Sequence, residues 1–262
     1  MPTSALQVAR TGLEAQDARM RVISNNLANV NTTAFKRDRA NFATLAYQDA
    51  RVAGERSSAE TAYATGLNLG TGVAVQSTSQ IMTQGALNNT GNALDLALEG
   101  DGYFQVQMPG GQLGYTRAGN FTRSAEGQLV TQQGYPVQPA ITVPEGASAI
   151  TVAPDGTVSA QLAGQSDPAE LGQLQVASFA NPSGLRALGD NFLSETAASG
   201  AAQLGPGGQN GAGNIRQGML EASNVNVVEE LVDMIECQRA YEVNSKMVSA
   251  VDEMLRNANQ TL

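Results

Sequence analysis

The sequence predicts an α+β protein with a long helix at each end, a central all-β domain and an extended connector. Apolar residues repeat every seven positions near both ends of the 262-residue chain. The middle instead consists of short runs of strand-forming residues separated by Gly and Pro. We therefore expect the two terminal helices to form a coiled-coil core domain and the middle to form a separate β domain.

The first helix is predicted over residues 4–30. Its apolar repeat consists of Leu6, Leu13, Met20 and Leu27, with Ala9, Ile23 and Val30 three residues later. A seven-residue repeat on a helix of 3.6 residues per turn predicts a left-handed supercoil against another helix. The helix is expected to end near 29–31, because Asn tolerates the left-handed conformation that ends helices.

The second helix carries the same kind of repeat. Its members are Leu220, Val227, Met234, Tyr241, Val248 and Leu255, flanked by Leu231, Met247, Val251 and Met254. Ser223 and Asn224 are good N-cap residues, so the helix is expected to start there. Both helices then meet the middle of the chain at similar Asn-Val-Asn junctions, which predicts an antiparallel pair with the middle looped out at one end.

Three regions follow from these patterns. The helical assembly domain is expected at 1–35 plus 220–262, and the all-β domain at 81–196. Its predicted strands are 103–106, 114–117, 128–131, 141–143, 149–152 and 174–179. Residues 36–80 plus 197–219 have low hydrophobicity and are predicted to form an extended connector, of which 46–72 is too long for an ordinary loop.

The composition argues against catalysis and against nucleic acid as a partner. The chain has no His, which removes the commonest general base and metal ligand, and no cofactor or metal site is expected. Its net charge of −9 disfavours binding to phosphate backbones or to anionic membranes. The N-terminus lacks the pattern of a secretory signal peptide, and no stretch approaches the roughly 20 apolar residues of a membrane span.

Four candidate sites have simpler interpretations. The Gly-rich run 205–213 lacks the Lys of a phosphate-binding loop, so it is interpreted as a linker. Glu99 and Asp101 precede a strand as ordinary turn residues. Cys237 is expected to be a small buried thiol. The basic cluster 36–39 is interpreted as a solvated face, with an intersubunit charge contact as its functional alternative.

The apolar stripes carry the main functional inference. Two helices alone bury one stripe each and have no third layer to complete a core. We therefore expect the stripes to pack against further copies of the chain. The predicted assembly interface consists of Leu6, Leu13, Met20, Ile23, Leu27, Val30, Val227, Leu231, Met234, Tyr241, Val248, Val251 and Leu255.

Four segments resemble the flagellar rod and hook family. Segments Ile23–Arg37 and Ser223–Lys246 are similar to the terminal signatures of this family, and Gly100–Val106 and Tyr115–Phe121 resemble its central motif. Within the family, a single β domain together with residues 46–72 is most similar to the distal rod type. The alternatives are a proximal rod or hook-type subunit and, from other classes, a secreted β-rich binding module or enzyme.

The resemblance implies a structural subunit that polymerises helically into a stiff drive shaft. The implied partners are further copies of the chain, other rod subunits, the hook protein, the rod cap and the surrounding ring proteins. Export by the flagellar type III apparatus without a cleaved signal, and a place in the periplasmic rod of the basal body, are implied as well. No insertion into a membrane is expected.

Overall fold

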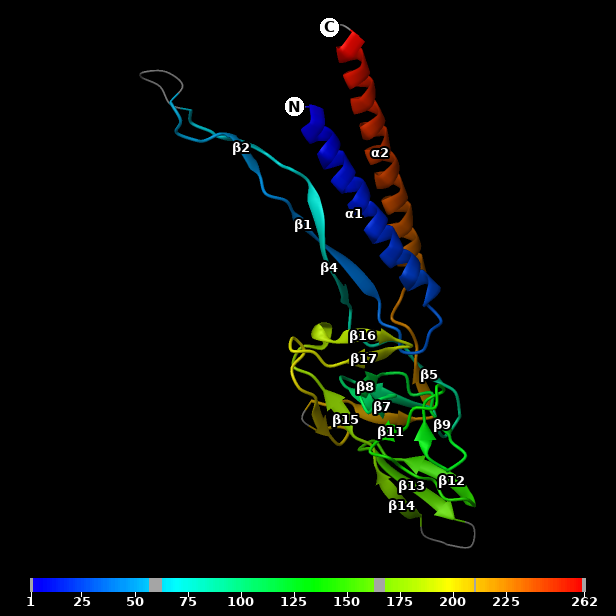
Figure 1. Ribbon diagram of the computed structural model, residues 1–262. Helices are drawn as coiled ribbons and strands as arrows, with labels where there is room; N and C mark the ends of the chain where they lie inside the picture. The colour runs from blue at the N-terminus through cyan, green and yellow to red at the C-terminus, as the bar shows by residue number, and fades with distance from the viewer. Residues whose placement is uncertain (1, 57–62, 163–167, 210, 261–262) are drawn as a thin grey trace. The chain divides into compact units, whose positions relative to one another are not determined.

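A computed structural model describes residues 2–56, 63–162, 168–209 and 211–260. It confirms the α+β class, with a helix at each end and a β-rich middle (Figure 1). The chain divides into two compact units. Unit 1 consists of Met1–Ala28, Asp38–Gln80 and Asn226–Leu262, and unit 2 consists of Asn29–Arg37 and Ile81–Val225.

Unit 1 contains the two long helices and a β ribbon. Its elements are α1 (Pro2–Ala28), β1 (Asp38–Thr44), β2 (Gln48–Arg51), β3 (Leu67–Leu69), β4 (Val73–Gln80) and α2 (Val227–Gln260). Helix α1 ends within three residues of the predicted position. The predicted start of α2 is wrong by three residues. Asn226 caps the helix instead, since its side-chain oxygen accepts a hydrogen bond from the Val228 backbone N–H.

Asn224 is used for a different purpose. Its side-chain oxygen accepts from the Arg37 backbone N–H at 2.7 Å, and its amide nitrogen donates to the Ile81 carbonyl at 2.8 Å. Both contacts lie within unit 2. The side chain therefore holds neighbouring segments of that unit together and does not cap α2.

The β ribbon of unit 1 joins two antiparallel strand pairs. Strand β1 pairs with β4, and a register shift follows Asn41. Strand β2 pairs with β3 farther along the same two chain segments. The Leu45 N–H donates to the Gly72 carbonyl at 3.0 Å and links the two pairs. Much of the stretch 46–72 is therefore a hydrogen-bonded β arm, of which residues 46–56 and 63–72 are described.

Unit 2 is built from short strands. They are β5 (Leu87–Asn89), β6 (Leu96–Glu99), β7 (Tyr103–Gln107), β8 (Leu113–Thr116), β9 (Thr122–Arg123), β10 (Leu129–Val130), β11 (Val137–Gln138), β12 (Ala147–Val152), β13 (Thr157–Leu162), β14 (Ala169–Gln173), β15 (Val176–Ser178), β16 (Arg186–Gly189), β17 (Phe192–Ser194), β18 (Gln203–Gly205), β19 (Asn214–Gln217) and β20 (Met219–Glu221), with a short 3-10 helix at Pro182–Gly184. The predicted strand at 141–143 is reduced to an isolated bridge between Gln128 and Thr142.

A seven-stranded sheet organises the core of unit 2. Its strand order is β16-β17-β8-β7-β15-β18, and β11 also pairs with β7. Side chains alternate between the two faces of β7, so Phe104 packs edge-on against Phe121 in one cluster while Tyr103 packs against Phe179 in another. The sheet is therefore covered on both faces.

The stretch 197–219 is part of this unit. It contains β18 and β19, which pair with β15 and β6, and the first residue of β20. Within the Gly-rich run, the Gly207 N–H donates to the Asp155 carbonyl at 3.0 Å and the Gly213 N–H donates to the Asp101 carbonyl at 2.6 Å. The described residues of this run are thus hydrogen-bonded to the β strands and their turns.

The chain segments that enter and leave unit 2 are hydrogen-bonded to each other. The Ala34 N–H donates to the Glu221 carbonyl at 2.8 Å, and the Asn224 N–H donates to the Phe35 carbonyl at 3.3 Å. Ala34 is buried and has a φ of 57°, in the left-handed region that disfavours side chains with a Cβ. The crossing of these two segments therefore holds a strained residue.

Replacing Ala34 with Gly should relieve this strain. The left-handed conformation costs an Ala roughly 1–2 kcal/mol, and the greater freedom of Gly in the unfolded chain offsets about 0.5–1 kcal/mol. We expect the free energy of unfolding in urea to rise by about 0.5 kcal/mol. In the control Ala187→Gly, in strand β16, the free energy of unfolding should fall. A lower unfolding midpoint for Ala34→Gly than for the parent would contradict this account.

Candidate assembly interface

The two helices of unit 1 contact each other in antiparallel order (Figure 1). Near the end of α1, the Asn26 amide donates to the Glu230 carboxylate at 3.2 Å, close to the start of α2. Farther along α2, the Cys237 thiol donates to the Gln16 carbonyl oxygen at 3.1 Å. Later residues of one helix thus meet earlier residues of the other, as the sequence predicts.

Polar and small residues fill the contact between the helices. The Arg19 guanidinium lies 2.9 Å from the Asp233 carboxylate, and both side chains are about one-third exposed or less. Gly12 lies against Asn244, whose amide nitrogen would be only 3.2 Å from a Cβ at position 12. A larger side chain at Gly12 would therefore require Asn244 to move.

The buried line of each helix differs from the predicted apolar stripe. The α1 residues that face α2 or lie next to this contact include Ala9, Gly12, Gln16, Arg19, Ile23 and Asn26. The innermost residues of α2 are Glu230, Cys237, Asn244 and Val251, again seven apart. This contact contributes little apolar burial, because most of its members are small or polar.

The structure places the predicted interface residues in four kinds of position. Two are buried, Ile23 and Val251. Seven in the helices are half-buried: Leu6, Leu13, Met20, Leu27, Met234, Val248 and Leu255. Three are exposed: Val227, Leu231 and Tyr241. Val30 is half-buried and lies in unit 2.

Near the start of α2, three exposed apolar residues were not among the predicted positions. Val228, Val232 and Ile235 are each more than half exposed. They lie about one helical turn apart, which is a signal that the sequence contains. The seven-residue repeat marks the neighbouring side of the same helix, and Leu231 lies between the two sets.

The structure shows the surroundings of three further residues that the sequence analysis singled out. Cys237 is buried, as expected, and burial raises the pKa of its thiol. The Glu99 carboxylate forms a half-exposed ion pair with Arg216 at 2.7 Å. Lys36 is buried, so the interpretation of its basic cluster as a solvated face is wrong for this residue.

Lys36 belongs to a buried group of three charges in unit 2, here called the junction cluster: Lys36, Arg117 and Glu221. The Lys36 ammonium lies 2.6 Å from one Glu221 carboxylate oxygen, and the Arg117 guanidinium lies 2.9 Å from the other. All three side chains are at most 5% exposed. The buried Glu221 carboxylate therefore accepts hydrogen bonds from two cationic side chains.

Backbone groups satisfy the remaining charges of the junction cluster. The Gly85 N–H donates to Glu221 at 2.9 Å, and Lys36 donates to the Thr83 carbonyl at 2.8 Å. Arg117 donates to the carbonyls of Gly100 and Gly102. Such complete pairing is what makes a buried ion pair tolerable, since each desolvated charge otherwise costs several kcal/mol.

The environment shifts two pKa values in the junction cluster. Burial raises the pKa of Glu221, but the Arg117 guanidinium and the hydrogen bond from Lys36 outweigh this effect and hold it below its usual value. Burial and the nearby Arg117 lower the pKa of Lys36, more than Glu221 raises it. Loss of the carboxylate charge would leave two buried cations together.

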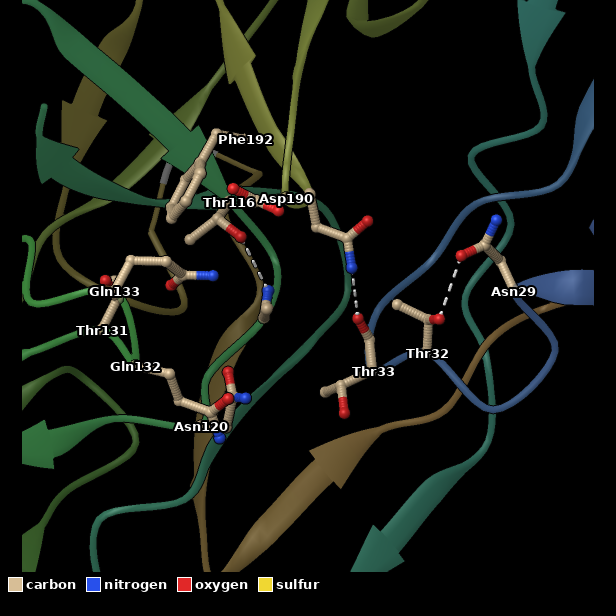
Figure 2. Close-up of a pocket in the computed structure, with 12 residues that line it drawn as sticks. Asn29, Thr32, Thr33, Thr116, Asn120, Thr131, Gln132, Gln133, Asp190 and Phe192 are labelled. Carbon is tan, nitrogen blue, oxygen red and sulfur yellow. Dashed lines mark hydrogen bonds between the residues drawn. The ribbon is translucent and has the colours of Figure 1, made fainter. Parts of the chain in front are cut away.

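A polar hollow of about 420 Å³ lies elsewhere in unit 2 (Figure 2). The Asn191 amide beside it donates to the Thr33 carbonyl at 2.8 Å and fixes the β16–β17 turn against the segment after α1. Asp190 is the one titratable side chain among its lining residues. The other lining side chains are mostly neutral Thr, Asn and Gln.

Comparisons with known proteins agree with these features. Three family models match: "Flagella basal body rod protein" at residues 6–36, "Flagellar hook protein FlgE/F/G D1 domain" at 97–160, and "Flagellar basal body rod FlgEFG protein C-terminal" at 216–261. A flagellar basal-body rod protein FlgG of Buchnera aphidicola is 50% identical over 256 residues, 98% of each chain. The chain belongs to the flagellar basal-body rod and hook family.

Two relatives from one organism show which type of rod and hook protein this chain resembles more. The FlgG protein of Caulobacter vibrioides is 47% identical over 98% of both chains. The FlgF protein of the same organism is 35% identical over 92% of this chain and 90% of its own. The chain is thus more similar to the FlgG protein.

The part of the chain that the structure describes shows neither a membrane-spanning helix nor a metal-binding cluster. None of its helices is long and apolar enough to cross a membrane. It also contains no group of three or more Cys, Asp or Glu side chains placed to hold a metal ion.

Acid should weaken the junction cluster. Because the folded-state pKa of Glu221 is lowered, its stabilisation is fully present above the ordinary Glu pKa of about 4.3 and is lost as the pH falls through the folded-state value. We expect Glu221→Gln to lower the free energy of unfolding by about 3–5 kcal/mol at pH 7. The difference from the parent should shrink below pH 4 or so.

Glu99→Gln provides the matched control, because it removes an exposed ion pair worth at most about 1 kcal/mol. Denaturant unfolding of both variants at several pH values, followed by near-ultraviolet circular dichroism, makes the comparison. Equal losses for the two variants at pH 7 would show that the junction cluster contributes no more than a surface pair.

Proposed function

We propose that the chain is a structural subunit of the flagellar distal rod, which polymerises helically into a stiff drive shaft and transmits torque from motor to hook. The observation that carries this proposal is the identity of 50% with a FlgG rod protein over 98% of both chains. The lower identity to FlgF favours the distal rod over a proximal rod subunit. Its role is mechanical, so no catalytic residue is assigned.

The terminal helices are proposed to form the polymer core. Within one copy the helix contact is lined largely by small and polar residues, so all the stripe residues except the buried Ile23 and Val251 are half-buried or exposed. Packing of neighbouring copies would remove these apolar groups from water, with about 25 cal/mol gained per Å². We therefore retain the predicted residues from Leu6 to Leu255 as the assembly interface, with coiled-coil packing between copies.

Further partners follow from a place in this shaft. They are other rod subunits, the hook protein, the rod cap during growth and the rings that surround the rod. A rod subunit must reach the periplasm. Export by the flagellar type III apparatus without cleavage would satisfy this requirement.

The β arm at residues 46–72 is proposed to stiffen the shaft. Its apolar side chains Tyr47, Leu67 and Leu69 are exposed. Exposed apolar groups on a narrow two-stranded arm are typical of a segment that docks on another surface. Docking between stacked copies would wedge their outer domains and suppress the compression and extension that accompany bending.

Shortening the arm should soften the polymer without preventing its assembly. Replacing residues 46–71 by Asn-Gly keeps the β1–β4 pair and supplies a tight turn, because Leu45 and Gly72 are already hydrogen-bonded. We expect polymers of normal yield that are curved or have a shorter persistence length in electron micrographs, because the terminal helices are untouched.

A second variant separates docking from arm length. The triple substitution Tyr47→Ser, Leu67→Ser and Leu69→Ser should soften the polymer as the deletion does. The control Asp49→Ser with Asn68→Ser alters polar groups of the same strands and should leave the polymer straight. Unchanged stiffness in both the deletion and the triple variant would show that the arm is only a tether.

A further inference from the structure

The outer face of α2 is apolar for two turns. Val228, Leu231, Val232 and Ile235 are 69%, 43%, 52% and 51% exposed. Their spacing of three, four and seven residues places them on one side of the helix, opposite Glu230 and Cys237. This pattern of anchors is the one by which helices dock into apolar grooves. We call these four residues the α2 outer face.

The β1–β4 ribbon has an uncovered apolar face as well. Phe42 and Val75 are directly opposite each other in the register, so their side chains lie on the same face, and they are 40% and 44% exposed. The next pair, Ala43 and Ala74, lies on the other face and is half-buried. Phe42 and Val75 define the ribbon outer face.

The ribbon contacts α1 within its own copy. The Val73 N–H donates to the Thr11 hydroxyl at 3.3 Å, and the Thr11 hydroxyl lies where a Cβ of Gly72 would be. A two-stranded ribbon is marginally stable alone and gains stability when apolar layers cover it. One copy supplies α1 as one such layer and leaves the outer face uncovered.

We propose that the α2 outer face of one copy packs on the ribbon outer face of the next. The ribbon then lies between α1 of its own copy and α2 of its neighbour, and both apolar faces leave water together. This inference rests on the proposed function, since it specifies which surfaces meet in the polymer. Because the two surfaces differ, the contact is heterologous, and a heterologous contact can repeat from copy to copy to form an open helical filament.

Charge argues against pairing of two α2 outer faces. Helix α2 carries seven acidic and three basic side chains, so two copies of it side by side would repel. Strands β1 and β4 together carry one acidic and one basic side chain, Asp38 and Arg39. The ribbon therefore accepts the acidic helix without like-charge repulsion.

Disulfide cross-linking of polymers tests the pairing. In a Cys237→Ser background, Val232→Cys and Val75→Cys variants of different mass are mixed, polymerised and oxidised. We expect a covalent dimer that contains one chain of each kind, and little cross-linking when either variant polymerises alone. The control Arg21→Cys, on a highly exposed position of α1, should not cross-link to Val75→Cys.

The outcomes separate this inference from the proposed function. Normal polymers without the mixed dimer would overturn the pairing and leave the rod assignment intact. A dimer of Val232→Cys with itself would show that the α2 faces pair with each other. Failure of the Cys237→Ser parent and of the unmodified chain to polymerise would instead count against the proposed function and the pairing together.

The critical concentration for polymerisation provides an independent test of the pairing. Val232→Ser with Ile235→Ser should raise the concentration needed for polymerisation by about tenfold for each apolar side chain that assembly buries. Asp17→Ser with Ser24→Ala, on the exposed side of α1, is the matched control. Equal effects of the two double variants would contradict the pairing.

Discussion

Two helices packed side by side can bury one stripe each, and in this chain the buried stripe is largely small and polar. Gly12, Gln16 and Asn26 line α1, while Glu230, Cys237 and Asn244 line α2. Such a contact fixes which residues meet, since each polar group needs its partner. Several apolar side chains of α2 remain exposed in one copy. The proposed assembly would bury them against other copies.

Unit 2, unlike the helix pair, has a large apolar core. Aromatic and aliphatic side chains cover both faces of its main sheet, and the chain enters and leaves through segments joined by the junction cluster. Breaking one partner of a buried ion pair costs several kcal/mol, so Lys36, Arg117 and Glu221 hold these segments together as a group. The covalent chain passes between the two units next to this cluster.

The sequence was sufficient to predict the α+β class, the approximate bounds of the two helices and their antiparallel order. A seven-residue repeat predicts the period of a helix contact. Which side of the helix faces its partner depends on which side chains are small enough for close approach. Here the small residues Gly12 and Cys237 lie at the contact. Asn224 has the properties of a cap, yet partners distant in sequence bind it. Burial of Lys36 depends on Glu221 and Arg117, which lie far along the chain. Long-range contacts of this kind leave no local pattern.

Amide hydrogen exchange of the dilute monomer and of the polymer tests the central claim most directly. If the terminal helices depend on neighbouring copies for their hydrophobic burial, amides of α1 and α2 should exchange at least about a hundredfold faster in the monomer than in the polymer. Strands β7 and β8, in the core of unit 2, should be protected in both states. Equal protection of the helices in monomer and polymer would contradict the claim, because it would mean that one copy stabilises them without assembly.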